Sequence, residues 1–244
     1  MRWGRLFLRG LGPAPWPALL AVTVCGWGLL LICEFSTVSE RICSASGFRS
    51  GDSGLIWATW SLMLLAMMPP LLAPGLRRVW VSSLTRKRWR AIVAFVMAYA
   101  VVWFAAGAAL FPLAIWLQTV SGVRTGGALI FAIAAALIWQ VSPAKQVCLN
   151  RCHGRPRLSA FGLAADLDAA RYGVMTGFWC LGACWALMLA PLVAGSGHLL
   201  LMAAAAVLIT FERQLPARPA RWRLPSLHAA IRVWVLHAAP RAAP

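Results

Sequence analysis

Cys180, Cys184 and Met188 form a stripe of sulfur-bearing side chains in the apolar stretch 172–193. This stretch is long enough to cross a lipid bilayer as a helix. The three residues are four positions apart, so a helix places them on one face. Thiolate and thioether sulfur prefer Cu(I), and Zn(II) is the second candidate for thiolates alone. Cys and Met are also common packing residues in apolar helices, so the spacing leaves packing and metal binding both open.

A second group of sulfur side chains lies in the apolar segment 55–73. Met63 and Met67 are four positions apart and share a helix face, and Met68 follows at once. Two prolines come next and remove backbone donors just below these residues. Two separate helices are therefore expected to bring sulfur to a similar depth, although core packing explains an isolated methionine pair equally well.

A third group lies on the cytoplasmic side of the fourth apolar segment. Cys148 and Cys152 are four positions apart, and His153 follows directly. A helical turn could present all three as metal ligands, or the cysteines could be a reduced pair without metal. Glu212 ends the last apolar segment, where it could serve as an oxygen ligand, carry a proton or pair with the adjacent Arg213.

The elements that must position these side chains follow from composition. The chain has 244 residues, of which 61% are hydrophobic, and a mean hydropathy of +0.74. Such values are typical of a polytopic membrane protein. The sequence predicts an all-α transmembrane helical bundle whose six apolar segments are 16–32, 55–73, 91–113, 128–141, 172–194 and 198–211. A single membrane domain, 16–215, would then lie between a cytoplasmic N-terminal tail, 1–15, and a cytoplasmic basic tail, 216–244. The basic tail includes a weakly amphipathic stretch, 224–239, that suits an interfacial helix.

The distribution of charge indicates the orientation of these segments. The chain carries 23 basic and 6 acidic residues, for a net charge of +17. Of the basic residues, 20 fall in the N-terminal tail, the C-terminal tail and the connections after the second and fourth segments. This positive-inside pattern predicts six spans in a bacterial inner (cytoplasmic) membrane, with both termini cytoplasmic. It explains the charge without a nucleic-acid partner and suits contact with anionic lipid headgroups.

Two features fall on the opposite side of the expected bundle. Cys33 and Cys43 flank a predicted outer loop, and an oxidising compartment would allow them to form a disulfide. His198 begins the sixth segment, and we interpret it as an interfacial residue.

Three blocks of residues, taken together, resemble the bacterial family of predicted metal-binding integral membrane proteins, a family of unknown function. The blocks are Trp60-x-x-Met63-x-x-Ala66-Met67-Met68 with Pro70; Gln140, Pro143, Lys145, Cys148-Leu149 and Cys152; and Gly177-x-x-Cys180-Leu181-Gly182-x-Cys184-Trp185-Ala186-Leu187-Met188 with Met202 and Glu212. Their order and spacing agree over about 60–216. The resemblance implies a polytopic bundle with a metal site. The chain departs from the family pattern at Ala183, Met175, Thr176, Arg213 and His153.

These observations favour a metal-handling membrane protein that binds Cu(I), or else Zn(II), for delivery, homeostasis or transport. Cys180 and Cys184 would bind the ion, and methionine thioethers would complete the set of sulfur ligands. Glu212 would contact these ligands without binding the ion itself. Partner proteins would donate or accept the metal.

Two other readings remain at this point. A scaffold or accessory subunit of a membrane complex is the main alternative, because small residues suit helix packing in membranes. A dithiol redox carrier is the second, although cysteines four apart on a helix point poorly at each other. The chain has no phosphate-binding glycine loop, no Ser/His/Asp arrangement and no His-Glu-x-x-His motif, so no enzymatic activity is expected.

Overall fold

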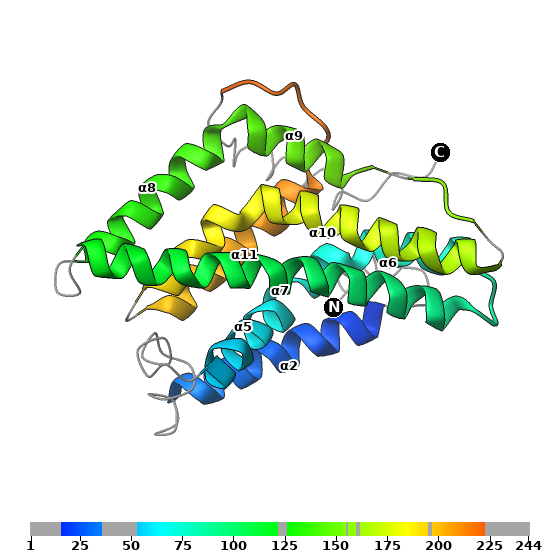
Figure 1. Ribbon diagram of the computed structural model, residues 1–244, viewed down its shortest axis with the longest axis horizontal. Coiled ribbons are helices and arrows are strands. Elements are labelled where there is room, and N and C mark those ends of the chain that lie inside the picture. The colour runs from blue at the N-terminus through cyan, green and yellow to red at the C-terminus, as the bar shows by residue number, and fades with distance from the viewer. Residues whose placement is uncertain are drawn as a thin grey trace, which may run out of the picture.

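The chain folds into α-helices, as its composition predicts (Figure 1). The computed structural model describes residues 16–35, 53–121, 126–154, 156–159, 162–194 and 197–222, and within these ranges there are no strands. The helices are α2 (Trp16–Phe35), α5 (Ser53–Met67), α6 (Pro69–Ser82), α7 (Arg88–Ser121), α8 (Gly127–Val141), α9 (Pro143–Cys152), α10 (Gly162–Val193) and α11 (His198–Gln214).

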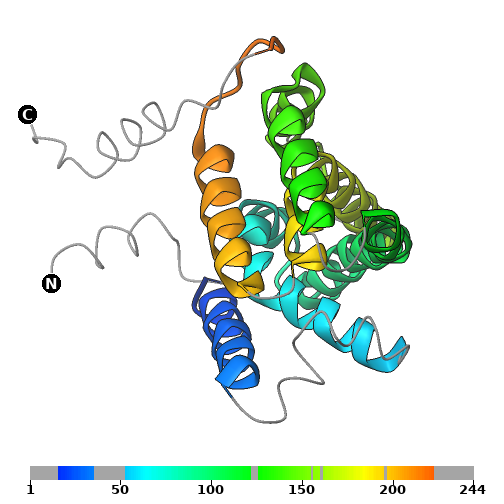
Figure 2. The same cartoon turned by 90° about the vertical axis from the view of Figure 1, so that its left-hand side faces the viewer.

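The two longest helices, α7 and α10, form the most extensive helix pair and run in the same direction (Figures 1 and 2). Gly173 and Gly177 of α10 allow this close approach. A Cβ at Gly173 would clash with the Phe95 carbonyl oxygen, and one at Gly177 would come within 3.0 Å of Val102 Cβ. The other helices pack mainly around α10, which leaves most of its apolar part buried.

One of the expected straight segments is bent, and another is followed by a helix at a sharp angle. The segment expected to be one helix over 55–73 is divided at Met68 into α5 and α6, whose axes differ by 66°. The fourth segment, expected over 128–141, agrees with α8, and a turn of 68° at Ser142 then leads into α9. Each second helix begins with proline, which lacks the backbone donor needed to continue the preceding helix but suits the first turn of a new one. At the second bend, Ser142 caps α9 by accepting a hydrogen bond from the Lys145 amide at 3.1 Å.

Two helices extend beyond the expected boundaries. The expected segment 91–113 is part of a helix that runs from 88 to 121 and contains Pro112, and the segment 172–194 begins ten residues earlier, at Gly162. The added N-terminal turns of these two helices carry charged side chains. Arg90 of α7 forms an ion pair with Asp166 of α10 at 2.8 Å there, with most of the arginine side chain exposed.

By length and composition, α7 and α10 could each cross a membrane, and the two bent pairs bring the number of candidate spans to four. The helix α2 is a shorter apolar element. The expected six spans and cytoplasmic termini therefore stay predictions. The tail 1–15, Cys43 and the predicted interfacial helix at 224–239 lie outside the described residues.

Candidate functional site

The hydroxyl group of Tyr99, on α7, contacts two sulfur atoms that belong to different elements. Its hydroxyl oxygen lies 3.4 Å from Met68 Sδ and 3.3 Å from Cys180 Sγ. All three side chains are buried. Met68 reaches Tyr99 from the bend between α5 and α6, and Cys180 reaches it from the middle of α10. The two sulfur atoms therefore lie within two hydrogen-bond lengths of each other, although their residues are far apart in the sequence.

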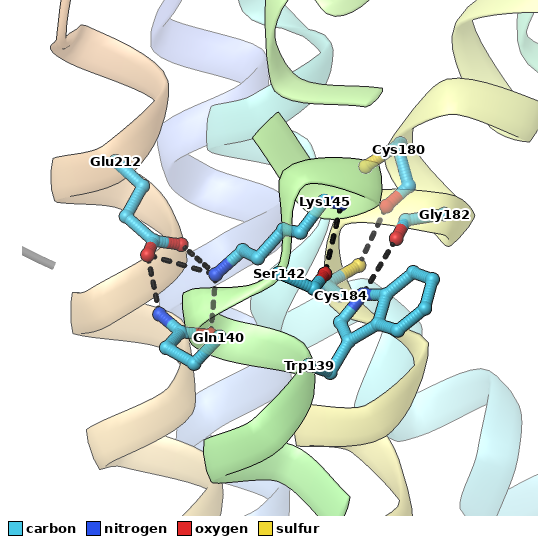
Figure 3. Close-up of polar contacts among 8 residues, drawn as sticks. All are labelled: Trp139, Gln140, Ser142, Lys145, Cys180, Gly182, Cys184 and Glu212. Atoms are coloured by element: carbon cyan, nitrogen blue, oxygen red, sulfur yellow. Dashed lines mark hydrogen bonds and ion pairs between the residues drawn. The ribbon is translucent and has the colours of Figure 1, made fainter. Parts of the chain in front are cut away.

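Cys184 lies one turn further along α10 and is fully buried. Its thiol donates a hydrogen bond to the Cys180 carbonyl oxygen at 2.9 Å (Figure 3). The expected common face of the two cysteines is thus present, and both thiols lie in the interior. The Cys184 thiol is also within electrostatic range of Lys145 on α9.

The other candidate methionines occupy different surroundings. Met67 lines a separate cavity of about 500 Å³ bordered by α2 and α11. Met63 and Met188 are 1% and 0% exposed and belong to the hydrophobic core. Met188 lies two helical turns beyond Cys180, or about 12 Å along the axis. The structure thus brings Met68 to the Cys180 thiol, whereas Met67 faces a different space.

The third group of candidate ligands, Cys148, Cys152 and His153, does not assemble as three metal ligands. Cys148 packs against Gly182 of α10, where an added Cβ would lie 2.7 Å from its Sγ. Cys152 lies on the wall of a cavity beside α6 and α11. The ring nitrogens of His153 contact the carbonyl oxygens of Leu149 and Arg213, at 2.9 and 3.1 Å. Across the described ranges, no three His, Cys, Asp or Glu side chains converge as a metal site.

Aromatic and cationic side chains hold α8 and α9 against α10. The Trp139 indole of α8 donates to the Gly182 carbonyl oxygen at 2.9 Å (Figure 3). The same indole contacts Trp185 edge to face. The Arg151 guanidinium lies 4.8 Å above the Trp179 ring. These contacts place Cys148 and Cys152 beside the helix that carries Cys180 and Cys184.

Glu212 forms a buried ion pair, but with Lys145 and not with the adjacent Arg213. The Lys145 Nζ lies 2.6 Å from Oε2 and 2.8 Å from Oε1 of the carboxylate. Gln140 contacts both charged groups through its amide (Figure 3). The side chains of Lys145 and Glu212 are only 2% and 9% exposed. With its carboxylate held by Lys145 and Gln140, Glu212 connects α11 to the second bend.

Arg213 supplies a positive charge to the sulfur cluster. Its guanidinium donates to the Leu71 carbonyl oxygen at 3.2 Å and lies within electrostatic range of Cys152, Cys180, Cys184 and Tyr99. A thiolate that binds metal requires such compensation in a buried setting.

Tyr99, Lys145 and Arg213 were not predicted as site residues. A signal was available, because Tyr99 is a polar residue inside an apolar segment and Lys145 is one of two lysines in the chain. His198, interpreted as an interfacial residue, begins α11 and is buried within the protein.

A family model described as PpoB2, copper chaperone, matches residues 57–236. No curated protein and no solved structure matches the chain. The matched range includes both bends and the helices that carry Met68, Tyr99 and Cys180. The expectation of a metal-related family is confirmed, and copper is the metal that the description names. The chain belongs to the PpoB2 copper chaperone family.

Proposed function

We propose that this protein is a membrane-embedded Cu(I) carrier that holds the ion as cargo on Cys180 and Met68. One observation carries the proposal: the Tyr99 hydroxyl contacts both sulfur atoms at hydrogen-bond distance. A thiolate and a thioether are a soft pair of ligands of the kind that Cu(I) prefers. Cu(I) that enters between them would displace the hydroxyl, and small side-chain movements would close the two sulfurs on the ion.

The donor set favours Cu(I) over Zn(II). Structural zinc sites use four ligands drawn from cysteine, histidine and carboxylates. No such group of even three converges within the described part of the chain. Two sulfur ligands satisfy Cu(I), and Cys184 is near enough to Cys180 to supply a third.

The remaining sequence-predicted residues have supporting roles in this proposal. Cys148 and Cys152 would receive or release the ion on the cytoplasmic side. Met63, Met67 and Met188 would keep the surroundings apolar and polarisable. Glu212 would act indirectly, because its ion pair with Lys145 fixes α9 and hence the two cytoplasmic cysteines.

The membrane setting is also part of the proposal. Counting each bent pair as one span and adding α2, α7, α10 and α11 gives the six spans that the charge pattern predicts. Large apolar side chains remain exposed along α7 and α8, among them Val101, Val120, Ile130, Phe131 and Leu137. A lipid environment would bury them.

In this reading the protein is not an enzyme. It would exchange copper with donor or acceptor proteins or small carriers, for delivery, homeostasis or transport, in the bacterial inner membrane. A subunit role in a membrane complex is the alternative, and the experiment below separates the two.

The test is the copper content of the purified protein after loading with Cu(I) under reducing conditions. We expect about one copper per chain, as one Cys180–Met68 pair requires, and loss of this copper in Cys180→Ser and Met68→Leu. Cys25→Ser is the matched control, because Cys25 is an exposed cysteine on α2 and should leave the copper content unchanged. Wild-type protein that binds no copper, or a Cys180→Ser variant that keeps it, would remove the basis for the carrier and favour the subunit role.

A further inference from the structure

A cavity of about 760 Å³ lies between α2, α6, α9, α10 and α11. This volume is in the range of roughly 300–1,000 Å³ that is usual for small-molecule sites. Its cationic lining comes from Arg77, Arg78 and Arg213, and the described residues around it include no Asp or Glu. Leucines of α2 and α6 form an apolar wall. The cavity therefore suits a small ligand with negative charge.

One sulfur atom in the wall narrows the class of ligand that this cavity suits. Cys152 belongs to its wall. The Cys152 thiol lies within electrostatic range of Cys148 and Cys180, and of Cys184 on the same face of α10. Arg213 belongs to the same wall and interacts with both Cys152 and Cys180. Cys152 is thus the thiol that connects the cavity wall with the cysteines of α10 near Tyr99.

We propose that this cavity binds a small anionic thiol carrying Cu(I), and that Cys152 takes the ion from it. This inference rests on the proposed function. The arginines hold carboxylate groups of the carrier, since guanidinium pairs well with carboxylate. The Cys152 sulfur then forms a bond to copper as the carrier's sulfur–copper bond breaks. The Cys152 proton passes to the departing thiolate, and copper remains Cu(I) throughout.

The position of Cys152 favours a thiol carrier over an anionic lipid headgroup or free phosphate. Either of these anions would pair with the arginines but would make no use of a sulfur on the wall. An anionic thiolate that carries copper would use both the arginines and the Cys152 sulfur. Copper exchange between thiolates requires the donor's sulfur and the acceptor's sulfur to approach the same ion. Cys152 provides that second sulfur at the place where the carrier would be held.

The test compares Cu(I) transfer to the full-length protein from two donors, the glutathione complex and the complex with uncharged 2-mercaptoethanol. We expect transfer from glutathione to be about tenfold faster at low ionic strength, because a charged cleft raises association rates by roughly 10 to 10³. Arg77→Gln/Arg78→Gln should abolish this advantage. Arg86→Gln/Lys87→Gln removes the same charge from the turn outside the cavity and should preserve it.

A second variant keeps the test informative if the arginine variant misfolds. Cys152→Ser keeps the charge of the cavity and should slow transfer from glutathione, because the entering sulfur is lost, while prolonged loading should still fill the inner pair. Equal rates from the two donors, or an advantage that survives Arg77→Gln/Arg78→Gln, would overturn the inference. If phosphatidylglycerol occupied the cavity and glutathione gave no advantage, the cavity would be a lipid site. Absence of copper binding from every donor would instead overturn the proposed function itself.

Discussion

The hydroxyl of Tyr99 has one proton and contacts two sulfur atoms, so it donates to only one of them at a time. Sulfur is a weak acceptor, and neither contact is costly to lose. The tyrosine is therefore suited to keep the space between Met68 and Cys180 polar until an ion enters it.

Replacing Tyr99 with phenylalanine tests this role. The variant keeps both sulfur atoms, so we expect copper binding at the wild-type ratio. Loss of the hydrogen bonds should lower the free energy of unfolding by about 0.5–1.5 kcal/mol. Copper content and denaturant unfolding in detergent measure the two effects. A Tyr99→Phe variant that folds but binds no copper would make the hydroxyl a ligand, and the two-sulfur site would be wrong.

The ion pair between Lys145 and Glu212 should respond strongly to the loss of one partner. Glu212→Gln leaves a buried ammonium without its counter-charge, which should lower the free energy of unfolding by about 3–5 kcal/mol. Removing both charges in Lys145→Met/Glu212→Leu should recover much of this loss. Asp166→Asn is the control, because its pair with Arg90 is largely exposed and should contribute no more than about 1 kcal/mol. Equal losses in Glu212→Gln and Asp166→Asn would mean that the pair is solvated.

Sequence reasoning at the residue scale found the sulfur atoms but not the groups that organise them. Cys180, Cys184 and Met68 were predicted because their types and local spacing point to soft metal ions. Tyr99 escaped prediction because its partner Cys180 is 81 positions away, and no local pattern reports such a contact. Pairing of Glu212 with Arg213, one of the roles left open by the sequence, assumes that neighbours in sequence interact, whereas helix packing places Lys145 opposite the carboxylate.

Among the elements, the bend between α5 and α6 controls which methionine meets Cys180. Met68 lies at the bend, while Met67, one residue earlier, faces a different cavity. Two prolines at the start of α6 enforce this geometry, because neither can donate the hydrogen bond that would continue α5.

Pro69→Ala/Pro70→Ala should therefore weaken copper binding without removing any sulfur. A straighter helix would turn Met68 away from Tyr99, and we expect at least a tenfold loss of Cu(I) affinity, about 1.4 kcal/mol. Competition with a chromophoric Cu(I) chelator measures this affinity. Pro112→Ala is the control, since Pro112 lies inside α7 away from the bend. An unchanged affinity in the double variant would show that other contacts fix Met68.

The elements themselves were largely predictable, and their bends were not. Long apolar runs indicate helices because only helices satisfy the backbone within such segments. Prolines at 69, 70 and 143 marked the places where hydrogen bonding fails, yet the size of each turn depends on packing against α10. The turns beyond the apolar segments were missed because hydropathy reports burial in lipid and not where a helix stops.

For the molecule as a whole, the orientation of the helices decides which side of the membrane the cavity faces. The charge pattern predicts that the connection after α9 faces the cytoplasm and that the connection after α10 faces the opposite side. Alkaline phosphatase fused after Ala194 should be active, and the same enzyme fused after Arg157 should be inactive by at least about tenfold, as the basic connection there predicts. The reverse result would place Cys152 on the outer side and exclude a cytoplasmic carrier.

The buried ion pair also has a consequence for how the protein is made. Lys145 and Glu212 are 67 residues apart in the chain. At a synthesis rate of about 5–20 residues per second, the lysine leaves the ribosome roughly 3 to 13 s before the glutamate does. During that interval α9 would enter the bilayer with an unpaired charge. We therefore expect the growing chain to hold α9 at the membrane surface until α11 emerges, and a chain truncated before Glu212 to be degraded by membrane proteases.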